Sequence, residues 1–185
     1  MLKFEMQLLG APLWLLDGAP IKGFVTRKAE ALLIYLAVNQ HIHRRSTLAA
    51  CFWPEVAEEH ARNNLRRTFS NLRTLVGSHL HIDRYTVAFD TQSTYALDVE
   101  QFTTLLTPIG GGDAQRSPSV ANQEKALVLY RADFLEGFLV HDAPLFEEWA
   151  RQKREYLHLE MFRSGLQEAA EWQGQRRWQA AGCLD

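Results

Sequence analysis

The stretch EEHARNNLRRTFSNLRTLVG, residues 58–77, decides how the sequence is interpreted. At about 100° per residue, its apolar residues fall on one stripe of a helix. The stripe consists of Ala61, Leu65, Thr68, Phe69, Leu72 and Val76. We expect a helix over 60–76 that Gly77 ends, with this stripe packed against neighbouring helices.

The opposite face of this helix carries arginine, asparagine, serine and threonine, and residues 60–76 contain no acidic residue. Arginine presents a planar fork to guanine O6 and N7 or to phosphate, and asparagine can pair with adenine N6 and N7. These are the side chains that a helix in the DNA major groove needs. A solvated basic face is the alternative, but such a face normally mixes both signs of charge in i,i+4 pairs.

Charge is distributed unevenly along the 185 residues, whose formal net charge is -2. Residues 1–97 hold 11 lysines and arginines against 8 acidic residues, whereas residues 98–185 hold 9 against 14. This asymmetry suggests two modules with different partners, and the first is the candidate for a polyanion. We therefore expect two domains, at 1–97 and 98–185.

The first half begins with short strands followed by a helix. Alternation in LKFEMQLLG, with the turn signals GAP and DGAP on either side of PLWLL, predicts a small antiparallel sheet. TRKAEALLIYLAVNQ predicts a helix over about 27–39, with Thr26 as its N-cap.

Two further elements flank the basic helix. Ser46 is expected to cap a short helix, STLAACFW, which Pro54 ends. His79–Phe89 is expected to form a β-hairpin around Asp83 and Arg84. A helix pair with a short connection, followed by a hairpin, is the winged form of the helix-turn-helix.

Beyond residue 97 the sequence becomes helical. Asp98 is expected to cap a helix in DVEQFTTLL, and segments 119–132 and 144–173 have helical patterns, the last opening at Pro144. Paired helices of this length resemble tetratricopeptide-like arrays. The predicted fold class is an α+β winged helix-turn-helix followed by an all-α helical domain.

The motifs in both halves support a family resemblance. DGAPI, TRKAEALLIYLAVNQ and RRSTLAACFWPEVAEEHARNNLRRTFSNLRTLVG resemble the OmpR/PhoB-type winged-helix domain of the Streptomyces antibiotic regulatory protein family. DVEQFTTLL, ALVLYRADFLEGF and APLFEEWARQKREYL resemble a shortened form of the bacterial transcriptional activator domain that follows it in that family.

The resemblance implies a transcriptional regulator that binds specific sites in double-stranded DNA. Such proteins are typically activators that bind repeated sites and contact RNA polymerase, and we expect homodimerisation or polymerase contact through the helical half. By position, residues 60–76 correspond to the recognition helix, 46–53 to the positioning helix and 79–89 to the wing. The candidate DNA-binding residues are Arg44, Arg45, Arg62, Asn63, Asn64, Arg66, Arg67, Ser70, Asn71, Arg73, Thr74 and Arg84.

An alternative function is a protein-interaction scaffold whose arginine face meets an acidic protein partner. The pair Asn63 and Asn64 favours DNA, because amide side chains add base recognition that an acidic protein would not require.

Other classes of protein find little support in the sequence. Apolar runs such as ALLIYLAV at 31–38 are far shorter than a membrane span, and the N-terminus lacks the features of a signal peptide, so a cytoplasmic location is expected. The pairs His41–His43 and His79–His81 lack a third ligand at a suitable spacing, so we expect exposed histidines and no metal site. No catalytic constellation or cofactor motif indicates an enzyme.

Overall fold

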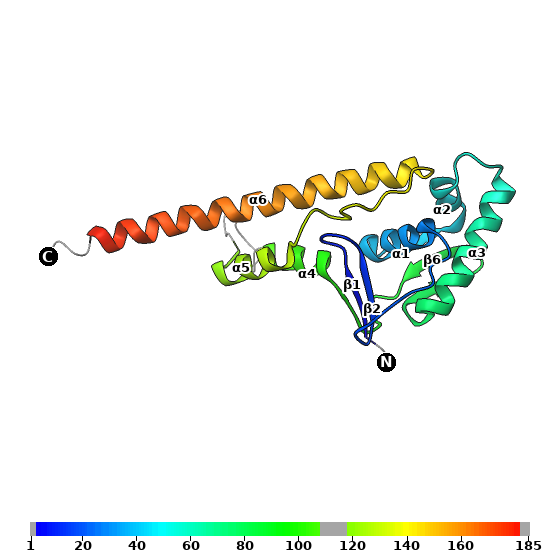
Figure 1. Cartoon of the computed structure of the whole chain (residues 1–185), viewed down its shortest axis with the longest axis horizontal. Helices are drawn as coiled ribbons and strands as arrows, with labels where there is room; N and C mark the ends of the chain where they lie inside the picture. Colours follow the sequence, from blue (N-terminus) through cyan, green and yellow to red (C-terminus); the bar gives the residue numbers. More distant parts are fainter. Residues whose placement is uncertain (1–2, 108–117, 182–185) are drawn as a thin grey trace.

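In the computed structural model of the chain, residues 3–107 and 118–181 are described, with side chains as far as Ser164. The β-strands are β1 (Phe4–Gln7), β2 (Leu13–Leu16), β3 (Ala19–Pro20), β4 (His43–Arg44), β5 (Leu80–Ile82), β6 (Thr86–Phe89) and β7 (Tyr95–Leu97). The α-helices are α1 (Arg27–Asn39), α2 (Arg45–Phe52), α3 (Glu58–Val76), α4 (Asp98–Leu106), α5 (Val120–Leu129) and α6 (Pro144–Ala181). Small sheets and helices thus alternate in an α+β arrangement (Figure 1).

The first sheet has the strand order β3-β2-β1-β7. The expected antiparallel strands are present, and Asp17 and Gly18 join β2 to β3 in a two-residue turn with φ of 49° and 77°. Positive φ at both residues suits the right-handed twist of a hairpin. The prediction missed β7, which pairs in parallel with β1, so the sheet is mixed rather than antiparallel.

Helix α1 spans the predicted residues, and the Thr26 hydroxyl accepts a hydrogen bond from the Ala29 N–H at 3.2 Å. The prediction of Ser46 as the cap of the next helix is wrong. Helix α2 begins at Arg45 after the backbone of Arg44, which makes no side-chain cap bond. The reason is strand pairing, since Arg44 lies opposite Thr86 in β6 and the Arg45 N–H donates to the Tyr85 carbonyl at 2.9 Å.

Helix α3 confirms the predicted apolar stripe, because all six of its residues are buried. The helix begins at Glu58, two residues earlier than expected, and ends at Val76. Gly77 has a φ of -59°, so it continues into a 3₁₀ turn, Gly77–His79, instead of adopting a left-handed cap.

The hairpin that follows α3 is also confirmed. Strands β5 and β6 pair with Ile82 opposite Val87, and β4 adds a third strand on the other edge of β6. One oxygen of the Asp83 carboxylate accepts bonds from the N–H groups of Tyr85 and Thr86, at 2.6 and 2.7 Å. The turn is therefore longer than the pair of residues predicted from the sequence.

The second half departs from the all-helical prediction between α5 and α6. Residues 130–143 form an irregular thread that runs beneath α6, back over the first half of the chain (Figure 1). Phe134 forms isolated β-bridges with Leu9 and Gly10, and the Leu135 N–H donates to the Leu8 carbonyl at 2.9 Å. The backbone that leaves β1 offers these hydrogen-bonding groups, and the thread satisfies them.

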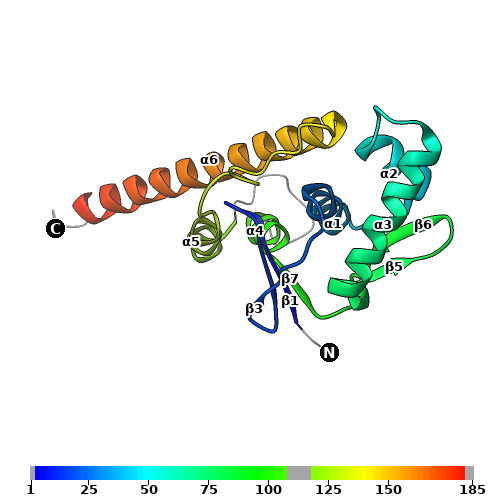
Figure 2. The same ribbon diagram turned by 45° about the vertical axis from the view of Figure 1, so that its right-hand side comes forward.

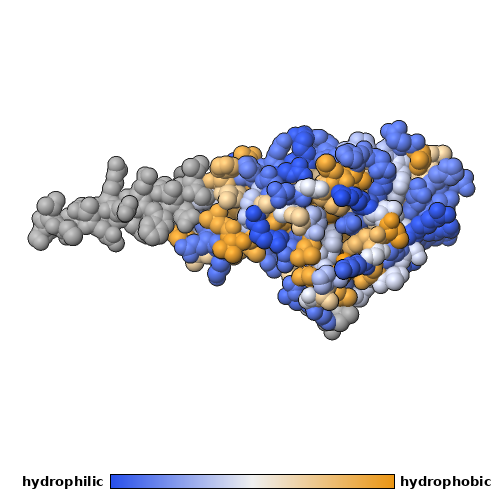
Figure 3. Space-filling view, in the orientation of Figure 1, coloured by the Kyte–Doolittle hydropathy of each residue, from blue (hydrophilic) through white to orange (hydrophobic). Residues whose placement is uncertain are grey.

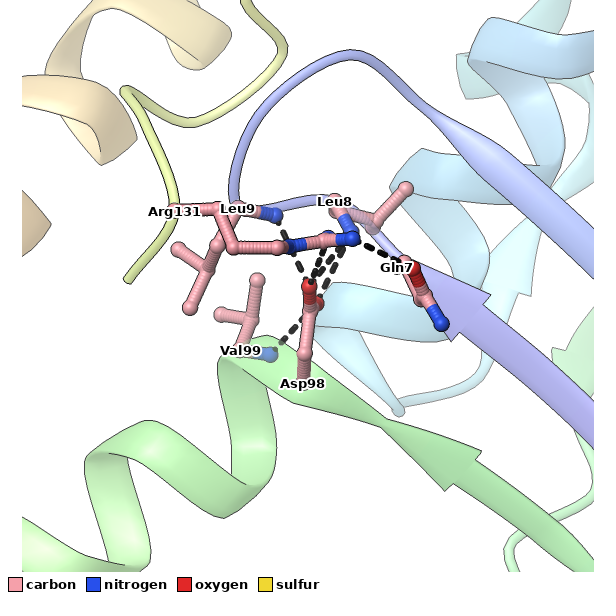
Figure 4. Close-up of polar contacts among 6 residues, drawn as sticks. All are labelled: Gln7, Leu8, Leu9, Asp98, Val99 and Arg131. Atoms are coloured by element: carbon pink, nitrogen blue, oxygen red, sulfur yellow. Dashed lines mark hydrogen bonds and ion pairs between the residues drawn. The ribbon is translucent and has the colours of Figure 1, made fainter. Parts of the chain in front are cut away.

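Asp98 ties the same region to α4 (Figure 4). It is the first residue of α4, and Leu97 takes the cap position that we expected for Asp98. The buried carboxylate accepts bonds from the N–H groups of Leu8, Leu9 and Val99 at 2.8 to 2.9 Å, and Arg131 lies 3.2 Å away. Burial raises the pKa of the Asp98 carboxyl. The hydrogen bonds and the Arg131 charge lower this pKa, but burial has the larger effect.

Helix α6 packs its first turns against the helices of the first half. The ring of Phe146 lies 5.5 Å from that of Phe52 in α2, and Trp149 lies 4.9 Å from Tyr35 in α1, with distances measured between ring centroids. Figure 2 shows the start of α6 beside these helices. Residues on both sides of position 97 share one hydrophobic core, and the division into two domains at 1–97 and 98–185 stays a prediction.

None of the helices within the described residues combines the length and the apolar character that crossing a bilayer requires.

Candidate nucleic-acid interface

The outer face of α3 keeps most of the polar side chains that the sequence assigns to it. Arg66, Arg67, Ser70 and Thr74 are exposed, and Asn63 is half-buried. Among the residues whose side chains are described, Arg66 and Arg67 form no hydrogen bond or ion pair, so their guanidinium groups are available to a ligand. The space-filling view shows hydrophilic residues gathered at the end of the molecule that contains α3 (Figure 3).

Two predicted arginines of α3 have partners within the chain. Arg62 forms an ion pair with Glu58, one helical turn earlier and just outside the acid-free stretch 60–76. Arg73 donates to the Ile82 carbonyl in β5 at 2.9 Å. Both side chains remain exposed, and Arg73 holds the hairpin against α3.

Two predicted asparagines turn toward the start of α1. The Asn71 amide accepts a bond from the Val25 N–H at 3.2 Å and donates one to the Gly23 carbonyl at 3.0 Å. Both ends of the Asn71 amide are therefore used within the chain, and a role of Asn71 in DNA binding stays a prediction. Asn64 is half-buried and lines a hollow beside α1.

The remaining arginines surround a cavity of about 570 Å³ between the start of α2, α3 and the hairpin, which we call the wing hollow. It is lined by Arg44, Arg45, Ser46, Arg62, Leu65, Arg84, Tyr85 and Thr86. Guanidinium groups are the side chains best suited to bind an anion such as phosphate, and four of them line this one concavity. The sequence prediction missed Ser46, Tyr85 and Thr86, although each is adjacent in sequence to a predicted arginine or to another residue of this group.

The wing hollow is held in shape by contacts of its own arginines. The Arg45 guanidinium lies 5.1 Å from the Phe69 ring centroid and donates to the Asp83 carbonyl at 2.9 Å. Hydrogen bonds from Thr86 and Tyr85 lower the pKa of the Asp83 carboxyl. Arg84, at the tip, lies 5.3 Å from the Tyr85 ring centroid. Arg45 therefore positions the hairpin, while Arg44 and Arg84 are exposed to a ligand.

The histidines do not form the exposed pairs that we expected. His43 and His79 are buried, with 6% and 1% of their surface exposed. Burial and the neighbouring His41 lower the pKa of His43 to about 4. The Nδ1 atom of His79 lies 2.8 Å from the Ser93 hydroxyl. In the part of the chain that the structure describes, no cluster of three or more histidine, cysteine or acidic residues is arranged to hold a metal ion.

Comparison with known proteins supports the fold. No family model and no curated protein match the chain. The solved structure of Mycobacterium tuberculosis EmbR in complex with a low affinity phosphopeptide is similar, with a TM-score of 0.61 and 21% sequence identity. The match covers 86% of this chain and 43% of the EmbR chain, so the chain spans less than half of EmbR. The likeness agrees with the Streptomyces antibiotic regulatory protein-like fold that the motifs indicate.

Proposed function

We propose that the protein is a transcriptional regulator that binds specific sites in double-stranded DNA, and that its activity is binding rather than catalysis. One observation carries the proposal: the outer face of α3 presents Arg66, Arg67, Ser70 and Thr74 to solvent, with Asn63 beside them. Guanidinium, amide and hydroxyl groups on one exposed helix face match the hydrogen-bonding edges of base pairs and the phosphates beside them.

In this proposal α3 enters the major groove as the recognition helix and α2 is the positioning helix. The hairpin β5–β6 is the wing. The wing hollow receives the phosphate backbone on one side of α3, because Arg44 and Arg84 offer exposed charged donors there. Arg73 and Arg45 fix the position of the wing by their bonds to the carbonyls of Ile82 and Asp83.

The helical half is proposed to supply self-association or contact with RNA polymerase, as the family resemblance implies. Its excess of acidic residues makes it a poor ligand for DNA as a whole, whereas the first half has an excess of basic residues. Activation at repeated sites follows the same resemblance. Binding at two sites would then be stronger than at one, because linked modules raise the effective concentration.

The proposal is tested by selecting duplexes from a random pool with the whole chain, then titrating the recovered duplex by fluorescence anisotropy at several salt concentrations. We expect a common sequence motif. If the protein neutralises about 4 to 6 phosphates, the slope of log K against log salt should be about -4 to -5. A pool that yields no motif, together with no salt-dependent binding, would leave an acidic protein as the candidate partner instead.

A further inference from the structure

A second hollow lies on the other side of α3 from the wing hollow. This α1-side hollow has a volume of about 670 Å³ and is bounded by residues 25–28 at the start of α1, by Trp53, by Asn64 and Arg67 of α3, and by residues 139–142. The last segment belongs to the thread that precedes α6. Residues from the helical half therefore lie next to the face that we propose to read DNA.

The α1-side hollow has an excess of positive charge. Arg27 and Arg67 are exposed, whereas the buried Lys28 pairs with Asp142, with 2.8 Å between Nζ and Oδ2. Among the described side chains, Asp142 is the only acidic one that lines the hollow, and Lys28 balances its charge. The Arg27 guanidinium lies 5.6 Å from the Phe138 ring centroid and remains exposed, as does that of Arg67. Together with the N-terminal end of α1, these two charges set the sign of the potential, which attracts an anion.

The segment 139–142 is fixed in place rather than loosely apposed. Lys28 also donates to the Asp142 carbonyl at 3.0 Å, and its Nζ lies 5.3 Å from the Trp53 ring centroid. The Val140 N–H donates to the Glu147 carboxylate at 2.6 Å. His141, between these two fixed residues, is exposed, and so is Leu139, which precedes them.

The two hollows lie on either side of the outer face of α3, which we propose to contact the bases. Arg62 lines the wing hollow and Arg67 lines the α1-side hollow, and five residues place their side chains about 140° apart around the helix. The major groove is about 12 Å wide and has a phosphate backbone along each edge. A helix lying in it therefore brings one hollow to each backbone.

We propose that the α1-side hollow binds the second phosphate backbone of the DNA, so that Arg27 and the segment 139–142 of the helical half belong to the DNA-binding surface. This inference rests on the proposed function. The helical half thereby completes the DNA site in addition to any role in assembly, and the Lys28–Asp142 ion pair holds its contribution in position.

The test titrates the selected duplex with the whole chain and two variants, after thermal unfolding has shown that each is folded. His141→Glu adds a carboxylate at the rim, and we expect about fivefold weaker binding at low salt, with the difference shrinking as salt rises. The matched control is Gln101→Glu, which adds the same charge at an exposed position of α4, away from the hollow, and should bind like the unmodified chain.

Arg27→Ala gives an independent measurement, because losing one phosphate contact should make the slope of log K against log salt shallower by about 0.9. Arg163→Ala, at an exposed arginine of α6, is its control. If the unmodified chain binds DNA and both hollow variants behave like their controls, the second phosphate site is wrong while the proposed function stands. If the unmodified chain binds no duplex, both proposals fall.

Discussion

Replacing Asp98 by alanine should destabilise the protein more than the loss of any exposed ion pair. The substitution removes the acceptor of three buried N–H groups, those of Leu8, Leu9 and Val99. An unsatisfied buried group costs about 1 to 3 kcal/mol, and water entering the space left by the carboxylate would recover part of this. Arg131 is half exposed and can be hydrated, so it adds little. We expect a loss of about 4 kcal/mol.

The loss is measured by urea and thermal unfolding followed by circular dichroism. In a chain of this size about 4 kcal/mol corresponds to a fall of roughly 8 to 16 °C in Tm. The stability of Asp98→Asn should lie between those of the unmodified chain and Asp98→Ala. Asparagine keeps one oxygen acceptor but turns an amide N–H toward the other donors. Glu124→Ala, which removes an exposed carboxylate from α5, should change stability by less than about 0.5 kcal/mol. A change below about 1 kcal/mol for Asp98→Ala would refute the reasoning.

Three other predictions test the reading face and the core. Arg66→Ala should weaken binding of the selected duplex by about 1 to 3 kcal/mol without changing Tm. The control Arg163→Ala should leave the affinity unchanged. A loss of stability in Arg66→Ala with unchanged affinity would mean that the exposed face of α3 is misassigned. Phe69→Ala should lower the unfolding free energy by roughly 3 to 5 kcal/mol while the folded fraction still binds DNA, and an unchanged urea midpoint would contradict its burial. The pKa of His43 is about 4 in the folded protein and 6.5 in the unfolded chain, so folding favours the neutral imidazole. The unfolding free energy should therefore fall as pH drops from 6.5 toward 4, by at most about 3 kcal/mol. His43→Leu should flatten this part of the stability–pH curve, and an unaltered curve would exclude His43 as its source.

Features that depend only on residues close together in the sequence could be predicted. The burial of the α3 stripe followed from its helical spacing, and the Thr26 cap followed from local side-chain chemistry. Arg66 and Arg67 are exposed because they lie on the side of the helix opposite the buried stripe. For these residues, neighbours within a few positions determine which way the side chain points.

The features set by contacts between distant segments were not predictable in this way. Asn71 shares the amphipathic pattern of α3, but its amide bonds to a loop 46 and 48 residues earlier in the chain. Strand β7 has only three residues and pairs with β1 across about ninety positions. Asp98 has the local signature of a cap, yet its carboxylate is directed to Leu8 and Leu9. No short-range pattern encodes these pairings.

The length of α6 has a mechanical consequence. Its 38 residues, at 1.5 Å each, make a rod of about 57 Å. The near end packs through Phe146 on Phe52 of the proposed positioning helix, and the far end projects from the body of the molecule (Figure 1). Contacts hold the helix well beyond that end, because Arg154 donates to the Phe134 carbonyl at 2.9 Å and Leu157 and Ser164 are buried. The 17 residues from 165 to 181, at 1.5 Å each, therefore form an arm of roughly 26 Å. A tilt of about 10° where this arm leaves the body would move its tip by roughly 4 to 5 Å, by the same geometry.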